Sequence, residues 1–198
     1  MSMALGLSAC GGGNDSSNSG NGGTSGGSAT SGTYDEPEFK LQLGHSDTTT
    51  NLIHISLENF ADYVYEQSNG RVEITIYAAE QLGSNAEMAE AVQMGSLDAM
   101  MMPQGQEAVY APKLNALGLP FLFPSYDAVY EVLDGEIGEE MVADLADSNM
   151  IQLAYWENGL RQVTNSRNPI NTPADMSGLK IRTPEDSMTI AIFVALGA

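Results

Sequence analysis

Four of the few positive charges in this chain lie close together, and their residue types suit the binding of an acid group. The 198-residue sequence has 7 Lys+Arg against 26 Asp+Glu, which gives a formal net charge of −19. Arg161, Arg167, Lys180 and Arg182 share one stretch in which Asp175 is the only acid, so the stretch is locally positive. An Arg side chain presents a planar fork that matches a carboxylate bidentately. This stretch is therefore a candidate binding site for a carboxylate.

Arg182 and Arg161 are the two guanidinium groups that we expect to face a ligand. Residues 179–182 have the pattern of a strand that ends shortly before Pro184, and binding residues gather at such strand ends. Arg161 lies in a second expected strand, where it either lines the pocket or pairs with Glu157. We interpret the other two cations of the stretch as surface charges or as partners of Asp175.

Three other side chains could complete the pocket, and two of them have a clear structural alternative. His45 is placed in the loop after the first expected strand, a position where α/β sheets bind ligands; the alternative is a solvated turn residue. Trp156, the only tryptophan, is either a pocket wall or a core residue. Gln104 follows Pro103 at the end of an expected strand and is a third ligand-binding candidate. We assign His54 to a helix and to a structural role.

The composition excludes several classes of function. Binding to nucleic acid or to anionic lipid requires a basic surface, which so acidic a chain does not supply. One cysteine allows no internal disulfide and no cysteine-based zinc cluster. The sequence has no Ser-His-Asp arrangement, no metal-ligand spacing and no phosphate-cradling glycine motif. We therefore expect no metal, no cofactor and no enzymatic activity.

The first 33 residues have the composition of a lipid-anchored leader. Residues 1–10 end in Leu7, Ser8, Ala9 and Cys10, which resembles the lipobox of bacterial lipoproteins, although no Lys or Arg precedes Cys10. This predicts a partial signal in which Cys10 becomes lipidated; the alternative is a chance cysteine in a flexible leader. Residues 11–33 are Gly, Ser, Asn and Thr with almost no charge, which predicts a flexible tether with a reach of roughly 25–30 Å.

The remaining sequence predicts an α/β fold with a partly parallel sheet, because strand and helix patterns alternate at short spacing. Residues 34–153 are expected to form a first lobe, with strands at 39–43, 71–77 and 97–102 and helices at 50–68, 86–94 and 126–147. Residues 117–124 are expected to be a buried apolar connector. Residues 154–198 are expected to supply crossing strands and the start of a second lobe, with strands at 150–156, 162–164 and 179–182 and a helix from Glu185 onward.

Six short motifs, in their shared order and spacing from about residue 39 onward, resemble one family. They are NGRVEI (69–74), EQLG (80–83), GSLD (95–98), LPFLF (119–123), GLR (159–161) and DMSGLKIRTP (175–184). The family is that of the solute-binding proteins of tripartite ATP-independent periplasmic (TRAP) transporters, of the dicarboxylate-binding type. The resemblance implies a periplasmic-binding-protein-like fold in which two α/β lobes, joined by crossing strands, close on a solute.

The same resemblance implies roles for individual residues. Arg182 is expected to make a bidentate bridge to a substrate carboxylate, with Arg161 as a supporting cation and Trp156 as a wall of the pocket. The family pattern continues with an Asn-Pro-Thr-Pro motif and a long bracing helix, and neither follows here. We therefore expect the first lobe to be near complete and the second to be truncated.

The expected function is that of an extracytoplasmic, lipid-tethered protein that captures an organic acid by hinge closure and delivers it to a TRAP permease. One alternative is a ligand sensor whose closed form docks a membrane receptor. A less favoured alternative is a carboxylate-processing enzyme with His45 as general base, for which the sequence offers no second catalytic group.

Overall fold

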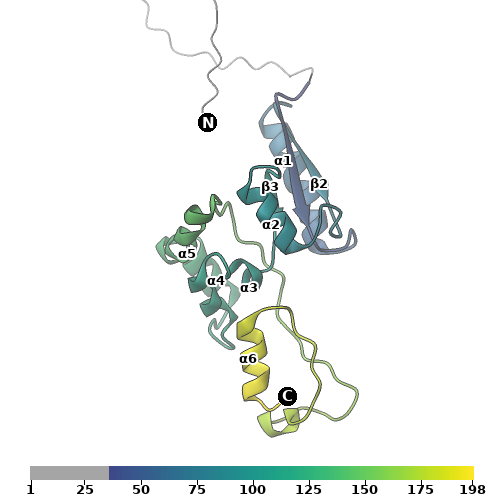
Figure 1. Cartoon of the computed structure of the whole chain (residues 1–198), viewed down its shortest axis with the longest axis vertical. Coiled ribbons are helices and arrows are strands. Elements are labelled where there is room, and N and C mark those ends of the chain that lie inside the picture. The colour runs from purple at the N-terminus through teal and green to yellow at the C-terminus, as the bar shows by residue number, and fades with distance from the viewer. Residues whose placement is uncertain (1–35) are drawn as a thin grey trace, which may run out of the picture. The chain divides into compact units, whose positions relative to one another are not determined.

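A parallel three-stranded sheet organises the first part of the structure. The computed structural model describes residues 36–198. Strand β1 (Phe39–His45) pairs with β2 (Val72–Tyr77) on one side and with β3 (Ala99–Met101) on the other, which gives the order β2-β1-β3 (Figure 1). The register places Leu43 opposite Ile76 on β2 and opposite Ala99 on β3. The α/β class and the parallel sheet predicted from the sequence are confirmed.

Helices α1 (Leu52–Gln67) and α2 (Asn85–Gln93) form the two crossover connections between the parallel strands. The side chain of Asn51 caps α1 by accepting from the backbone N–H of Ile53 at 2.9 Å. Ser84 and Glu87 form a reciprocal capping box at the start of α2. These polar caps satisfy backbone N–H groups that have no partner inside the helix, so they fix where each helix begins.

The two faces of β1 pack against different helices. Leu43 belongs to a buried cluster with Ile53 and Leu57 of α1. The neighbouring Gly44 faces α2, because an added Cβ would lie 2.6 Å from Sδ of the fully buried Met88. Successive strand residues point to opposite sides of a sheet, so this alternation places a helix on each side of β1.

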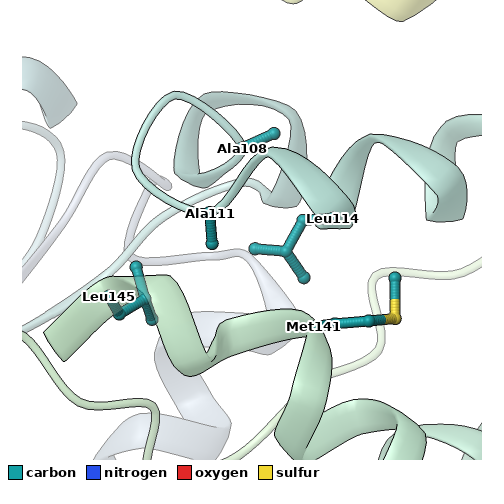
Figure 2. Packing of buried hydrophobic residues seen from close by; sticks show 5 residues of the cluster. All are labelled: Ala108, Ala111, Leu114, Met141 and Leu145. Atoms are coloured by element: carbon teal, nitrogen blue, oxygen red, sulfur yellow. The ribbon is translucent and has the colours of Figure 1, made fainter. Parts of the chain in front are cut away.

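A second buried cluster joins helical segments that follow the sheet. Helix α3 (Gln104–Glu107) and the 3-10 helix η1 (Pro112–Gly118) face helix α5 (Glu136–Val142) and the 3-10 helix η2 (Ala143–Ser148). Ala108, Ala111, Leu114, Met141 and Leu145 make up this cluster, and in Figure 2 Ala111 and Leu114 lie across from Met141 and Leu145. This cluster holds the segment after β3 in place, and helix α3 in that segment carries Gln104 and Gln106.

The single helix expected at 126–147 is instead three segments. Helix α4 (Tyr126–Leu133) ends at Asp134, α5 starts after Gly135, and η2 follows α5 directly. Gly138 explains the break, because a Cβ at this position would lie 1.9 Å from the carbonyl oxygen of Leu133. Only a glycine lets the chain fold back so closely on the end of α4.

The strands expected at 150–156, 162–164 and 179–182 do not form. Figure 1 shows no arrow over these residues, and none of them pairs with β1, β2 or β3. Several of their apolar side chains are uncovered, with Ile151 78% and Leu153 76% exposed, although Leu179 is buried. A strand needs a neighbour that takes up its backbone hydrogen bonds, and the described part of the chain offers none here.

After β3, one expected feature is absent and another is present. The apolar run at 117–124 is not buried, since Leu119 and Leu122 are about half exposed and Phe121 is fully exposed. The helix expected from Glu185 onward is present as α6 (Ser187–Ala195), with the side chain of Asp186 accepting from Thr189 N–H at 2.7 Å. A short 3-10 helix, η3 (Pro173–Met176), precedes it.

Part of the sequence-based description lies outside the described residues. Cys10 and the tether at 11–33 fall there, so the lipid anchor stays a prediction. The division into lobes at residues 153 and 154, inside the described residues, also stays a prediction. Within residues 36–198, no helix is both long enough and apolar enough to cross a membrane.

Candidate functional site

The carboxyl ends of β1 and β3 meet at one edge of the sheet and carry a group of polar side chains. His45 is the last residue of β1, Ser46 follows it, and Gln106 lies on α3 just after β3. Asn85 joins them from the first turn of α2. Ligands of open α/β sheets bind outside the carboxyl ends of the strands, so this edge is the candidate site.

His45 lies inside the protein and is not the solvated turn residue that was one alternative. Its ring is 0% exposed, and its Nε2 lies 3.0 Å from Nδ1 of His54 on α1. Nε2 of His54 in turn lies 3.3 Å from Oε1 of Glu58, one helical turn further on. Burial lowers the pKa of His45, and the neighbouring His54 lowers it further. His45 is therefore held as a neutral imidazole near neutral pH.

One ring nitrogen of His45 has no hydrogen-bond partner. Nδ1 is buried, and no side chain or backbone group among the described residues bonds to it. The structure extends β1 through His45, whereas the sequence pattern ended the strand at Leu43. The pairing of His45 with Met101 on β3 and the packing against α1 account for the two extra residues.

Asn85 is a site residue that the sequence analysis missed. Its amide donates to Oγ of Ser46 at 3.2 Å and to Oε1 of Gln106 at 2.7 Å. Its carbonyl oxygen Oδ1 is buried and has no partner in residues 36–198. An Asn directly after a Ser cap could have been noticed as a helix start that faces the strand ends.

A cavity of about 570 Å³ lies beside the start of α1. It is lined by the first residues of α1, by Tyr130 of α4 and by residues 155–159. Within the wall of this cavity, the O–H of Tyr130 donates to Oε2 of Glu157 at 2.5 Å. That hydrogen bond is the main reason why the pKa of Tyr130 is raised. The volume falls within the usual range for small-molecule sites.

Trp156 has core contacts and also lines the cavity, and its role as a wall of the ligand pocket stays a prediction. It packs against the cluster of Leu43, Ile53 and Leu57, and its ring meets Phe60 edge to face with centroids 6.1 Å apart. It also lines the cavity beside α1. The half-buried indole is thus fixed by core contacts while part of it faces open space.

Gln104 is occupied by a structural contact. Its Nε2 donates to the carbonyl oxygen of Leu114 at 2.5 Å, which ties α3 to η1. Its neighbour Gln106 contacts Asn85 instead, so the structure brings Gln106 and not Gln104 into the polar group.

The arginines of the positive stretch lie on the surface, apart from the polar group and the cavity. Arg161 and Arg182 are exposed, and neither makes a hydrogen bond or ion pair with any described residue. Glu157 bonds Tyr130 and not Arg161. Arg167 donates to the carbonyl oxygen of Gly178 at 3.0 Å. Asp175 is engaged by Thr172 and by the backbone N–H of Asn171, not by the cations of the stretch.

Glu107 is a second titratable group that the sequence did not reveal. It lies on α3 beside the buried cluster shown in Figure 2, and burial raises its pKa to about 7. Burial raises the pKa of Tyr155, and the negative charge of ionised Glu107 raises it further. In the part of the chain that the structure describes, no group of three or more His, Cys, Asp or Glu side chains is placed to hold a metal ion.

Comparison with known proteins decides the family. Residues 43–198 match the family described as bacterial extracellular solute-binding protein, family 7 (DctP). The chain belongs to this family. The resemblance to TRAP solute-binding proteins predicted from the sequence motifs is thereby confirmed. The family is one of extracytoplasmic transport proteins and not of enzymes.

Two relatives of this family 7 protein have named ligands. The 2,3-diketo-L-gulonate-binding periplasmic protein of Escherichia coli is 38% identical over 158 residues, which are 80% of this chain and 48% of the relative. The C4-dicarboxylate-binding protein of Bacillus subtilis is 32% identical over 144 residues, 73% of this chain and 41% of the relative. The chain thus spans about half the length of the curated relatives it matches.

Solved structures of TRAP solute-binding proteins have the same fold. One from Advenella mimigardefordensis, in complex with galactonate, superposes with a TM-score of 0.75 at 27% identity, covering 82% of this chain and 52% of that one. Another from Sulfurospirillum deleyianum, with bound succinate, has a TM-score of 0.73 at 28% identity, covering 82% of this chain and 52% of that one. The periplasmic-binding-protein-like fold class is therefore confirmed.

Proposed function

We propose that this protein captures an organic acid outside the cytoplasm and delivers it to a TRAP permease. The acid is held between two lobes, with its carboxylate bridged bidentately by Arg182 and supported by Arg161. The sheet edge at His45 and the wall at Trp156 form the opposite side of the site. The ligand stabilises the closed form, and it shifts the population of molecules toward closure.

One observation carries this proposal. The family match extends through the stretch that contains both arginines, and those two guanidinium groups have no partner among the described residues. A cationic group without a protein partner is available to bind a carboxylate, and relatives of this chain are named for the acids they bind. The acidity of the whole chain means that the arginines act at short range and not by long-range attraction.

Isothermal titration calorimetry of organic acids tests the proposal. Arg182→Lys should lose most of the affinity, because an ammonium cannot form the bidentate bridge. Truncation of one partner of a desolvated charge pair costs ~2–5 kcal/mol, or roughly 30- to several-thousand-fold in Kd. Arg167→Lys is the matched control, because Arg167 already bonds the carbonyl oxygen of Gly178, and it should bind as wild type does. Binding by Arg182→Lys within twofold of wild type would refute the bidentate role.

We also propose that the protein is lipid-anchored through Cys10. The small-residue run before Cys10 and the uncharged segment at 11–33 support an anchor followed by a tether. Labelling of cells with a fatty-acid analogue should mark the wild-type protein and not Cys10→Ser. Equal labelling of both forms would show that the anchor is elsewhere.

A further inference from the structure

We propose that His45 and His54 form a pH-sensitive contact between β1 and the first turn of α1, which holds a wall of the cavity in place at neutral pH and loosens in acid. The two rings are the only imidazoles of the chain. Both residues are buried, with His45 0% and His54 7% exposed, and the ring centroids lie 5.2 Å apart. The proposal concerns the described residues themselves and is independent of the proposed function.

The hydrogen bonds of the pair leave one place for an added proton. As a carboxylate, Glu58 can only accept, so His54 donates to its Oε1 from Nε2 across 3.3 Å. Nδ1 of the neutral His54 is then bare, and it accepts from Nε2–H of His45 across 3.0 Å. A neutral imidazole carries one N–H, so Nδ1 of His45 is bare as well. This atom is the ring nitrogen of the pair that has no hydrogen-bond partner.

A proton taken up in acid disfavours the contact. Only one hydrogen fits between His45 Nε2 and His54 Nδ1, so while the contact lasts the extra hydrogen ends on His45 Nδ1, whichever ring takes up the proton. That atom is buried and has no acceptor among the described residues. The pair then holds a buried charge and an unpaired N–H, and both are unfavourable in a protein interior. A second proton would place two N–H groups against each other, which the contact cannot accommodate.

The charged groups around the pair offset this effect only in part. Asp47, in the turn after β1, favours the protonated form of His45, and Glu58 lies at the outer end of the relay on α1. Opposite His45 on β3 lies the uncharged Met101, and the turn after β2 contributes the backbone N–H of Glu80, which donates to the His45 carbonyl oxygen at 3.2 Å. Burial and the neighbouring imidazole outweigh Asp47, so the pKa of His45 is lowered. Acid therefore favours a state in which the contact is open.

The histidine contact lies next to the cavity beside α1. The cavity is lined by residues 51–53 and Ser56, which flank His54 at the start of α1, and by Trp156. Leu57, which is 1% exposed, anchors the following turn of the helix in the core. We therefore expect acid to loosen the start of α1 and this wall of the cavity while the sheet and the rest of the helix stay in place.

Nitrogen-15 NMR tests the contact in the wild-type protein, and two histidines make the assignment simple. At pH 7.5 the spectrum should show Nε2 protonated and Nδ1 bare in both rings. Between pH 7.5 and pH 5.5, the amide of Ile55, which donates to the carbonyl oxygen of Asn51, should lose roughly 3- to 5-fold of its protection from hydrogen exchange, and the amides of β2 should lose none. A proton on His45 Nδ1 at pH 7.5 would overturn the proposal. So would unchanged protection of Ile55 while either ring gains a proton.

The fluorescence of Trp156, the only tryptophan, reports on the cavity wall without a ligand. It should change between pH 7.5 and pH 5.5 in the wild-type protein. The double variant His45→Gln with His54→Gln has no imidazole and should lose this change. Glu107→Gln is the matched control and should keep it, because burial raises the pKa of Glu107 to about 7 and its carboxyl group titrates in the same range.

A double variant that responds to pH as the wild type does would overturn the proposal. Loss of the response in Glu107→Gln would assign it to the helical region and overturn the proposal as well. The NMR experiment uses the wild-type chain alone, so it decides the question even if the double variant does not fold.

Discussion

The sheet region and the stretch that carries the arginines differ in how far each can organise itself. Strands β1, β2 and β3 lie close in sequence, and they pair with each other and pack against α1 and α2. Residues 151–182 also have strand-like apolar residues, yet Ile151, Leu153 and Leu160 are each more than three-quarters exposed. The sheet edge is therefore organised by its own strands and helices, whereas Ile151, Leu153 and Leu160 gain no such cover from the described part of the chain.

The largest expected effect is the loss of stability when a leucine is truncated in the sheet region rather than in residues 151–182. Leu57 is 1% exposed, so Leu57→Ala should lower the free energy of unfolding by about 2–5 kcal/mol. Leu153→Ala removes the same atoms from a side chain that is 76% exposed, and it should change that free energy by no more than about 0.5 kcal/mol. Urea denaturation followed by Trp156 fluorescence measures both. Comparable losses would mean that residues 151–164 are packed as firmly as α1.

The sequence was sufficient to predict a strand or a helix where the signal lies within the element itself. Alternating residues predicted β2, and the polar caps at Asn51 and Ser84 mark the starts of α1 and α2. It failed where the outcome depends on a distant partner. The pattern at 179–182 gives a tendency to form a strand but supplies no neighbouring strand. The sequence also does not show that the chain turns back after α4 so tightly that a Cβ at Gly138 would meet the Leu133 carbonyl.

The candidate site shows the same limit. The sequence placed His45 directly after the first expected strand, and this position at the carboxyl edge of the sheet follows from the pattern of β1 alone. Its burial and its contact with His54 depend on how α1 packs, and the bond between Asn85 and Gln106 joins helices α2 and α3. The exposure of Arg161 and Arg182 could not be predicted from their spacing, and their roles stay predictions.

An intermediate effect concerns the buried carboxyl group in the helical region. The pKa of Glu107 is about 7 in the folded protein and near 4.5 when unfolded, so the folded state binds more protons between these values. Stability should therefore fall as pH rises from 4.5 through 7. Glu107→Gln should be more stable than wild type at pH 8, by on the order of 2 kcal/mol after discounting for partial screening, and about equally stable at pH 4.5. Thermal melts at the two pH values measure this difference.

The matched control for Glu107 lies on the neighbouring helix. Glu139 of α5 is exposed, so Glu139→Gln should not alter the dependence of stability on pH. If Glu107→Gln kept the wild-type slope between pH 4.5 and pH 8, the carboxyl group of Glu107 would not be buried as described.

The smallest effect tests the sheet side of the site. Burial lowers the pKa of His45 in the folded protein below its ordinary 6.5. At a pH between the folded and the unfolded pKa, the unfolded chain therefore binds a proton that the folded protein does not. Stability should fall as pH drops from 6.5, by no more than about 1 kcal/mol at pH 5.5. His45→Gln, a neutral side chain that can still donate to His54, should lose this acid-side decline. A wild-type protein that became more stable on acidification, relative to His45→Gln, would show that His45 gains a proton on folding.

The most direct test is a crystal structure of the protein with a bound organic acid. The account predicts that both oxygens of one carboxylate lie against the guanidinium of Arg182. An acid bound with Arg182 still in solvent would contradict it.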